Sequence, residues 1–201
     1  MADHLEIEQK FDVDEHFTRP DFGALPGVTA DAPVTYHLAA TYFDTPGTRL
    51  AASKITLRRR TGGTDEGWHL KLPAGAGSRR ELQEPLGDFR DKVPERLASR
   101  VAEVTDGLPL APIATLDTER TVVTLHADDG HVVAEIADDV VTARRLGEAP
   151  GGAARPLRWR EVEVEVPESA PELQRAAADL LFAAGARPAG HGSKLARLLG
   201  S

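Results

Sequence analysis

The sequence contains no cysteine, which excludes disulfide bonds, thiol catalysis and metal sites built from thiolates. It also has no run of about 18 or more apolar residues, the length that a helix needs to cross a bilayer, so no membrane-spanning helix is expected. Its first residues do not follow the basic and then apolar layout of a signal peptide. We therefore expect a cytoplasmic protein.

Basic residues are fewer than acidic ones. The chain of 201 residues has 24 lysines and arginines against 32 aspartates and glutamates, a formal net charge of −8. Nucleic acids and membrane surfaces are both polyanionic, so this balance argues against either one as a general partner. A small anion can still bind where basic side chains converge. The length is sufficient for a single domain spanning residues 1–201.

Alternation of apolar and polar residues dominates the chain and predicts β-strands. The predicted strands cover residues 4–13, 34–43, 54–61, 67–72, 80–86, 114–126, 131–144 and 157–166. Apolar residues recur with helical spacing in three shorter segments, 94–105, 170–184 and 193–199. Many strands and few helices are typical of a mainly β (α+β) fold, here an antiparallel β-barrel with a few helices packed outside.

The polar faces of these strands are charged in a selective way. Acidic side chains gather on the first and the late strands, and basic side chains gather on the middle ones. The acids that share a face are Glu6 and Glu8 early in the chain, and Glu161, Glu163 and Glu165 late in it. The bases are Arg58 and Arg60, Lys71 beside His69, and Arg120. If the sheet closes, the late strands approach the first one and the barrel contains an acidic and a basic zone.

Each zone suits a different ligand. Carboxylate oxygens are the ligands that hard divalent cations such as Mg²⁺ and Mn²⁺ prefer. Arginine grips phosphate through two parallel hydrogen bonds. The sequence is therefore compatible with a metal-assisted phosphate site, although periodicity alone does not establish closure of the sheet.

Ordinary explanations exist for each of these features taken singly. A charged strand face is common on a solvent-exposed sheet, and most single lysines and arginines are surface charges. Gly75-Ala76-Gly77-Ser78 is more typical of a hairpin tip than of a phosphate cradle, because the lysine and the following helix of a P-loop are absent. The seven histidines lack the spacing of a zinc protease.

The order of the motifs, however, resembles one family. The first strand, His4-Leu5-Glu6-Ile7-Glu8-Gln9-Lys10-Phe11, resembles the Glu-x-Glu-x-Lys signature of the CYTH family, also called triphosphate tunnel metalloenzymes. The likeness continues in order through Tyr42-Phe43-Asp44-Thr45, Leu57-Arg58-Arg59-Arg60, Trp68-His69-Leu70-Lys71-Leu72, Arg79-Arg80-Glu81, Thr118-Glu119-Arg120, Ala134-Glu135-Ile136, Trp159-Arg160-Glu161-Val162-Glu163 and Gly192-Ser193-Lys194. Independent exposed strands would not reproduce this order.

The resemblance implies a closed antiparallel barrel of about eight strands whose bore holds a triphosphate, and metal-dependent cleavage of that triphosphate. By position, the implied metal ligands are Glu6, Glu8, Glu161 and Glu163, and the implied phosphate ligands are Lys10, Arg58, Arg60, Lys71, Arg120 and Lys194. Glu6, Glu8, Lys10 and Glu163 are the implied catalytic residues. Glu81 and Glu135 are further acidic residues of the tunnel, with Glu84 and Asp138 as their alternatives if the register shifts.

One position departs from the pattern. Gln83 stands where many relatives have a second acid after Arg-x-Glu. If that acid positions the metal or the attacking water, its absence slows the chemistry or changes the metal preference.

The expected reaction is hydrolysis of inorganic triphosphate, or of a short polyphosphate, with Mg²⁺ or Mn²⁺ as cofactor. The alternatives are a non-catalytic module that binds polyphosphate, a thiamine triphosphatase and an adenylyl cyclase; aromatic residues at 5% do not favour a ring platform for the last two. The chain also resembles the leading part of proteins that continue into a CHAD domain, a helical phosphate-binding module, which makes such a domain a candidate partner.

Overall fold

A computed structural model describes residues 3–74, 79–87, 92–147, 155–167 and 170–200, with side chains from Glu8 onward. The longer strands are β1 (Asp3–Val13), β3 (Val34–Asp44), β4 (Thr56–Thr61), β5 (Gly67–Pro73), β6 (Arg79–Glu84), β7 (Ala111–His126), β8 (Val132–Arg145) and β9 (Leu157–Val166). Two short strands are β2 (Thr29–Ala30) and β10 (Arg187–Pro188). The helices are η1 (Phe22–Ala24), α1 (Arg49–Ala52), α2 (Glu95–Arg100), α3 (Ala102–Thr105), α4 (Pro171–Ala183) and α5 (Lys194–Leu199).

The eight longer strands pair in an antiparallel circuit. Their order is β1-β6-β5-β4-β3-β7-β8-β9, and β9 pairs again with β1. Strand β1 meets β6 along Asp3–Glu6 and β9 along Ile7–Val13, so it passes from one neighbour to the other and the barrel is not strictly closed at any one level. The mainly β architecture predicted from the alternation is confirmed, and each predicted strand is present within a few residues of its expected bounds.

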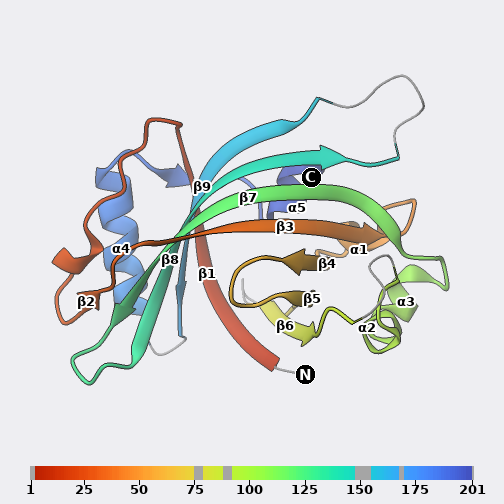
Figure 1. The fold of residues 1–201 in the computed structure, drawn as a ribbon, viewed down its shortest axis with the longest axis horizontal. Coiled ribbons are helices and arrows are strands. Elements are labelled where there is room, and N and C mark those ends of the chain that lie inside the picture. The colour runs from red at the N-terminus through yellow and green to blue at the C-terminus, as the bar shows by residue number, and fades with distance from the viewer. Residues whose placement is uncertain (1–2, 75–78, 88–91, 148–154, 168–169, 201) are drawn as a thin grey trace.

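Helices cover the outer, apolar face of the sheet (Figure 1). Helix α4 packs Ala177 and Leu181 against a cluster that includes Phe11, Val162 and Val164 of β1 and β9. At the other end, α2 and the turn after it lie on the outer face of β4, β5 and β6 in a second cluster of apolar residues, whose largest member is the fully buried Trp68. Because these outward residues are apolar, period 2 directs the intervening polar residues to the lumen.

Helix α5 lies on the opposite, inward face. Its Leu195 and Leu198 pack against Leu116, Val141 and Trp159, which point inward from β7, β8 and β9. The long strands curve over this helix (Figure 1). The Ser193 hydroxyl accepts a hydrogen bond from the Ala196 amide at 3.0 Å and so caps the first turn. The helix therefore fills one end of the barrel and carries Lys194 into the lumen.

The structure departs from the predicted helices in one place. The segment 94–105 forms two short helices, α2 and α3, which meet at Val101. The buried Val101 side chain packs with Leu97 against the outer cluster. None of the helices in the described ranges is long and apolar enough to pass through a bilayer.

Asp44, the last residue of β3 and part of one of the family-like motifs, has a structural role. Its side chain is fully buried and accepts hydrogen bonds from the backbone amides of Thr45, Leu50 and Ala51 at 2.6, 2.9 and 3.0 Å. These amides belong to the turn and to the start of α1, where unpaired N–H groups need acceptors. The carboxylate thus fixes the link between β3 and α1.

We expect Asp44→Ala to lower the free energy of unfolding by about 2–3 kcal/mol, because buried amides lose a charged acceptor. Urea denaturation followed by circular dichroism measures this. Asp117→Ala, at an exposed position on β7, is the matched control. Equal stability of the two variants would contradict the assigned role of Asp44.

Candidate functional site

The lumen holds a cavity of about 460 Å³. Most of the residues predicted to act on a triphosphate border it: Glu8, Lys10, Arg58, Arg60, Lys71, Glu81, Arg120, Glu135, Glu163 and Lys194. They come from seven strands and from α5, and alternation along each strand turns the strand residues inward. The structure thus brings together residues that are up to 186 positions apart in the sequence (Glu8 to Lys194).

Two predicted metal ligands stand apart from this set. Glu161 does not border the cavity; it lies deeper in the barrel, where its carboxylate accepts a hydrogen bond from the Trp159 ring nitrogen at 2.6 Å. The side chain of Glu6 lies outside the described part of the structure, and only its backbone is placed, opposite Arg79 of β6. Their predicted role as metal ligands therefore stays a prediction.

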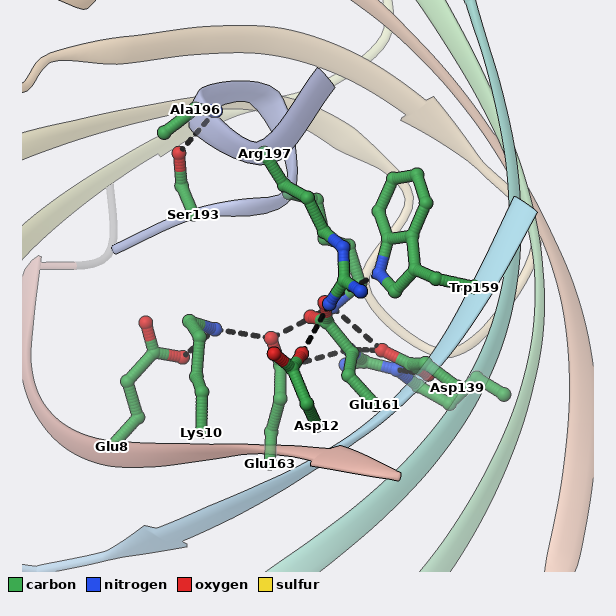
Figure 2. Close-up of polar contacts among 12 residues, drawn as sticks. Glu8, Lys10, Asp12, Asp139, Trp159, Glu161, Glu163, Ser193, Ala196 and Arg197 are labelled. Carbon is green, nitrogen blue, oxygen red and sulfur yellow. Dashed lines mark hydrogen bonds and ion pairs between the residues drawn. The ribbon is translucent and has the colours of Figure 1, made fainter. Parts of the chain in front are cut away.

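Glu163 is the centre of the ionic network. It accepts hydrogen bonds from Lys10 of β1, from Lys194 of α5 at 2.7 Å and from Arg120 of β7 at 2.7 Å. Figure 2 shows Lys10 between Glu163 and Glu8, whose carboxylate it contacts at 3.0 Å. Burial acts to raise the pKa of Glu163, but the three cations outweigh it and hold the pKa well below its ordinary value. Glu163 is therefore ionised.

Glu163 also belongs to a buried cluster of three carboxylates. Oxygen atoms of Asp139, Glu161 and Glu163 lie within 4.8 Å of one another, a spacing that suits a metal ion. Lys194 compensates the negative charge of this cluster, because its Nζ lies 2.7 Å from an oxygen of each of the three carboxylates. Burial acts to lower the pKa of Lys194, but these carboxylates raise it above its ordinary value. The ammonium group thus takes the place that a cation would have.

Asp139 was missed in the sequence. It is fully buried and receives two hydrogen bonds from the Arg120 guanidinium, at 2.8 and 2.6 Å. The signal was available, because Asp139 shares a strand face with Glu135, four residues earlier, which the sequence did identify. Of the register alternatives, Asp138 points outward and pairs with Arg160 at 2.8 Å, while Glu84 pairs with Arg96 at 3.7 Å.

One wall of the cavity is basic. Arg58 donates a hydrogen bond to the Tyr42 hydroxyl at 3.4 Å, and among the described residues it makes no ion pair; its buried Nε has no partner. Arg60 pairs with Asp65 of the loop between β4 and β5. Burial lowers the pKa of Arg60, and the nearby Arg58 and Arg120 lower it further. Guanidinium groups that repel one another around a cavity favour binding of an anion.

The opposite wall is acidic. Glu165 borders the cavity and stands in register with Glu8 on one side and with Glu135 on the other. Burial raises the pKa of Glu165, and Glu8, Glu135 and Glu163 add to this effect against the pull of Lys71. Carboxylates crowded in this way fit a hard divalent cation, which takes oxygen ligands and relieves their repulsion. The same alternation that identified Glu163 marks Glu165, which the predicted ligand set left out.

We expect Lys194→Ala to lower the free energy of unfolding by about 3–5 kcal/mol, because three buried carboxylates lose their shared cation. Mn²⁺ should restore part of this loss by binding the vacated carboxylates. Thermal unfolding with Mn²⁺ and with EDTA tests both points, and exposed Lys92→Ala is the control. A Lys194→Ala protein as stable as the control would contradict the assignment.

Two solved structures, one bacterial and one from a plant, have a similar fold. A candidate adenylate cyclase from Bacillus halodurans superimposes with a TM-score of 0.65 at 18% identity, over 98% of each chain. A candidate adenylyl cyclase from Hippeastrum, HpAC1, with a dominant triphosphatase activity, gives a TM-score of 0.55 at 18% identity, over 97% of this chain and 95% of that one. At such identities the likeness establishes the fold.

Sequence comparison gives nearer relatives and the family. An uncharacterized protein of Mycobacterium tuberculosis, Rv2226 in strain H37Rv and MT2285 in strain CDC 1551, is 43% identical over 211 aligned positions, which cover this whole chain and 41% of that protein. The chain thus spans about two fifths of the length of these relatives. The model of the CYTH domain matches residues 4–198. The ordered motifs, the charged barrel and this match agree, and the chain belongs to the CYTH family, the triphosphate tunnel family.

Proposed function

We propose that this domain hydrolyses inorganic triphosphate to pyrophosphate and phosphate with the help of Mg²⁺ or Mn²⁺. The observation that carries the proposal is the segregation of charge across one cavity. Arg58 and its basic neighbours line one side, and Glu8, Glu163 and Glu165 line the other. Membership of the CYTH family supports it, as does the triphosphatase activity of the structurally similar HpAC1.

The basic wall would hold the substrate. Arg58, Arg60, Lys71 and Arg120 can bind oxygens along an extended polyanion, which offsets its repulsion and fixes the in-line geometry that phosphoryl transfer needs. The cavity lining is charged, and Tyr42 is its one aromatic side chain in the described part of the chain. A substrate without an organic group matches this lining best.

The acidic wall would hold the metal. Glu8 and Glu163, from the set that the sequence predicted, together with Glu165, offer carboxylate oxygens at the cavity surface, and the predicted Glu6 lies two residues before Glu8. When bound there, a divalent cation would neutralise the negative charge that develops on the phosphate oxygens. Glu161 would act from behind by holding Lys194, which contacts it at 2.7 Å.

Binding would exchange ion pairs within the lumen. In the structure, Lys10, Lys194 and Arg120 all contact Glu163. Phosphate oxygens would then pair with these three cations, and the Glu163 carboxylate would be available to hold a divalent cation. Each buried charge then keeps a partner, whereas either ligand alone would leave charges of one sign uncompensated. Lys10, between the two walls, would form an ion pair with a phosphate oxygen and stabilise the charge that develops on it during cleavage.

We expect Glu8→Gln and Glu163→Gln each to lower turnover of triphosphate by roughly a hundredfold or more, because each removes a charged oxygen ligand. Phosphate release with Mg²⁺ and with Mn²⁺ measures this. Glu119→Gln, at an exposed position on β7, is the matched control. Near-normal turnover in both lumen variants, with metal present, would remove the proposed metal site.

We expect Arg58→Ala to raise KM for triphosphate by roughly tenfold or more, because one charge-assisted contact to phosphate is lost. Steady-state kinetics checks this against Arg158→Ala, an exposed arginine on β9. An unchanged KM and turnover in Arg58→Ala would contradict its role as a phosphate ligand.

A polyphosphate-binding module is the second candidate, because the basic wall, in which Arg58 makes no ion pair with any described residue, would serve it equally well. Phosphate release with metal, compared with polyphosphate binding in EDTA, separates an enzyme from a binding module. Cyclic AMP formation from ATP and hydrolysis of thiamine triphosphate test the remaining alternatives. The greater length of the mycobacterial relatives leaves room for a fused partner, for which the CHAD domain remains our proposal.

A further inference from the structure

A buried histidine lies beside the basic wall, on the inward face of β5 and in register with Arg58, without bordering the cavity. The side chain of His69, on β5, is 1% exposed and does not border the cavity. Its Nδ1 contacts Oε1 of Glu81 on β6, and its Nε2 lies 2.9 Å from the backbone carbonyl of Asp65. The other carboxylate oxygen of Glu81, Oε2, lies 2.9 Å from Nζ of Lys71. His69 therefore touches the partners of two cavity residues, Lys71 and Arg60.

The hydrogen atoms of this pair can be counted. A backbone carbonyl only accepts hydrogen bonds, so Nε2 of His69 must carry a hydrogen. A bare Nδ1 facing an ionised carboxylate would set two lone pairs against each other, so their contact requires a second hydrogen, on Nδ1 or on the Glu81 oxygen. In both arrangements His69 and Glu81 together have a net charge of zero.

We propose that His69 and Glu81 hold one shared proton, and that this buried pair preserves the positive charge of the basic wall while it positions Lys71. The proposal deepens the function proposed above and rests on it for the identity of the anion. His69 is a positioning residue, because it acts through Glu81 and through Asp65.

The charged groups that face His69 come from every neighbouring element. They are Arg58 and Arg60 on β4, Lys71 on β5, Glu81 on β6 and Asp65 in the β4–β5 loop. Burial has the largest effect and lowers the pKa of His69, the hydrogen bond to Glu81 raises it, and Arg58 and Arg60 lower it; together they bring the pKa to about 4. These effects push the proton toward Glu81, whereas Lys71 favours an ionised Glu81. The proton thus lies between two groups that compete for it.

The proton has a consequence for the ligand. An ionised Glu81 without a proton beside it would subtract one charge from the wall formed by Arg58, Arg60, Lys71 and Arg120. With the proton present, this wall presents its full charge to an anion. As pH rises and the pair loses the proton, Glu81 gains a negative charge and the affinity for a polyanion falls.

The exceptional residue Gln83 belongs to the same network. Its Nε2 donates a hydrogen bond to Oε1 of Glu81 at 3.2 Å. An amide fixes the Glu81 side chain without adding charge, whereas an acid at this position would place a second negative charge on the same strand face. Gln83 and the shared proton therefore act in the same direction: both keep this wall basic.

Two substitutions separate the proton from the hydrogen bonds. Asn in place of His69 can still donate toward Glu81, and Gln can still donate toward the Asp65 carbonyl, but neither shares a titratable proton with Glu81. We expect both variants to bind triphosphate in EDTA roughly tenfold more weakly than the unmodified protein at pH 7, because Glu81 is then ionised. The difference should vanish at high pH, where the unmodified pair has also lost its proton.

Calorimetric titration with inorganic triphosphate from pH 6 to pH 9 measures this, and comparison at each pH removes the titration of triphosphate itself. His37→Asn, at an exposed position on β3, is the control and should bind like the unmodified protein. If His69→Gln binds with normal affinity at pH 7, the shared proton is refuted and His69 only anchors the loop.

Nuclear magnetic resonance of protein labelled with ¹⁵N-histidine tests the proton directly and without ligand. We expect a hydrogen on Nε2 of His69 and a second, strongly downfield proton at its contact with Glu81, absent from His69→Asn. A bare Nδ1 with no such proton would overturn the inference. If the protein binds no triphosphate even with Mg²⁺ or Mn²⁺ present, the proposed function fails, and the resonance experiment alone decides whether the pair holds a proton.

Discussion

The contacts of Glu163 with three cations are the interaction on which the rest of the structure depends. A carboxylate at this depth is tolerated only if cations and hydrogen bonds replace the water that it loses. Lys10, Arg120 and Lys194 supply them from β1, β7 and α5, three elements that are far apart in the sequence. The same network therefore orders the lumen and holds the terminal helix in the end of the barrel (Figure 2).

A charged lumen imposes a constraint on the outside of the sheet. If the inward side chains are ionic, the apolar half of each strand must face outward, and it needs a cover that a plain barrel does not have. Helix α4 covers β1 and β9, and α2 covers β4 to β6. Two of the three apolar clusters thus lie between the barrel and its outer helices, the third packs α5 inside one end of the barrel, and the rest of the lumen is left for ligands.

Much of this arrangement could be read from the sequence, because period 2 alone assigns each residue to a face. Alternation set Glu8, Arg58 and Glu163 on the charged faces of their strands, and the family resemblance assigned those faces to the lumen, where the structure has them. Alternation does not encode depth along a strand, however. Glu161 and Glu165 share a face with Glu163, yet one is covered by α5 and Trp159 while the other borders the cavity. Only the register between strands separates them.

Net charge was an equally incomplete guide to the ligand. A chain with a net charge of −8 repels polyanions at long range, but salt screens this repulsion within about 8 Å, whereas charges inside a buried cavity are screened far less. Close contacts with Arg58 and Arg120 therefore favour an anion in the cavity in spite of the net charge. The acidic wall favours an anion that carries a divalent cation with it. Because Glu8, Glu135 and Glu165 face the same cavity, an anion accompanied by a divalent cation meets less repulsion there than a bare one. The excess of acid that argues against nucleic acid as a partner is thus compatible with a phosphate site that also needs a metal.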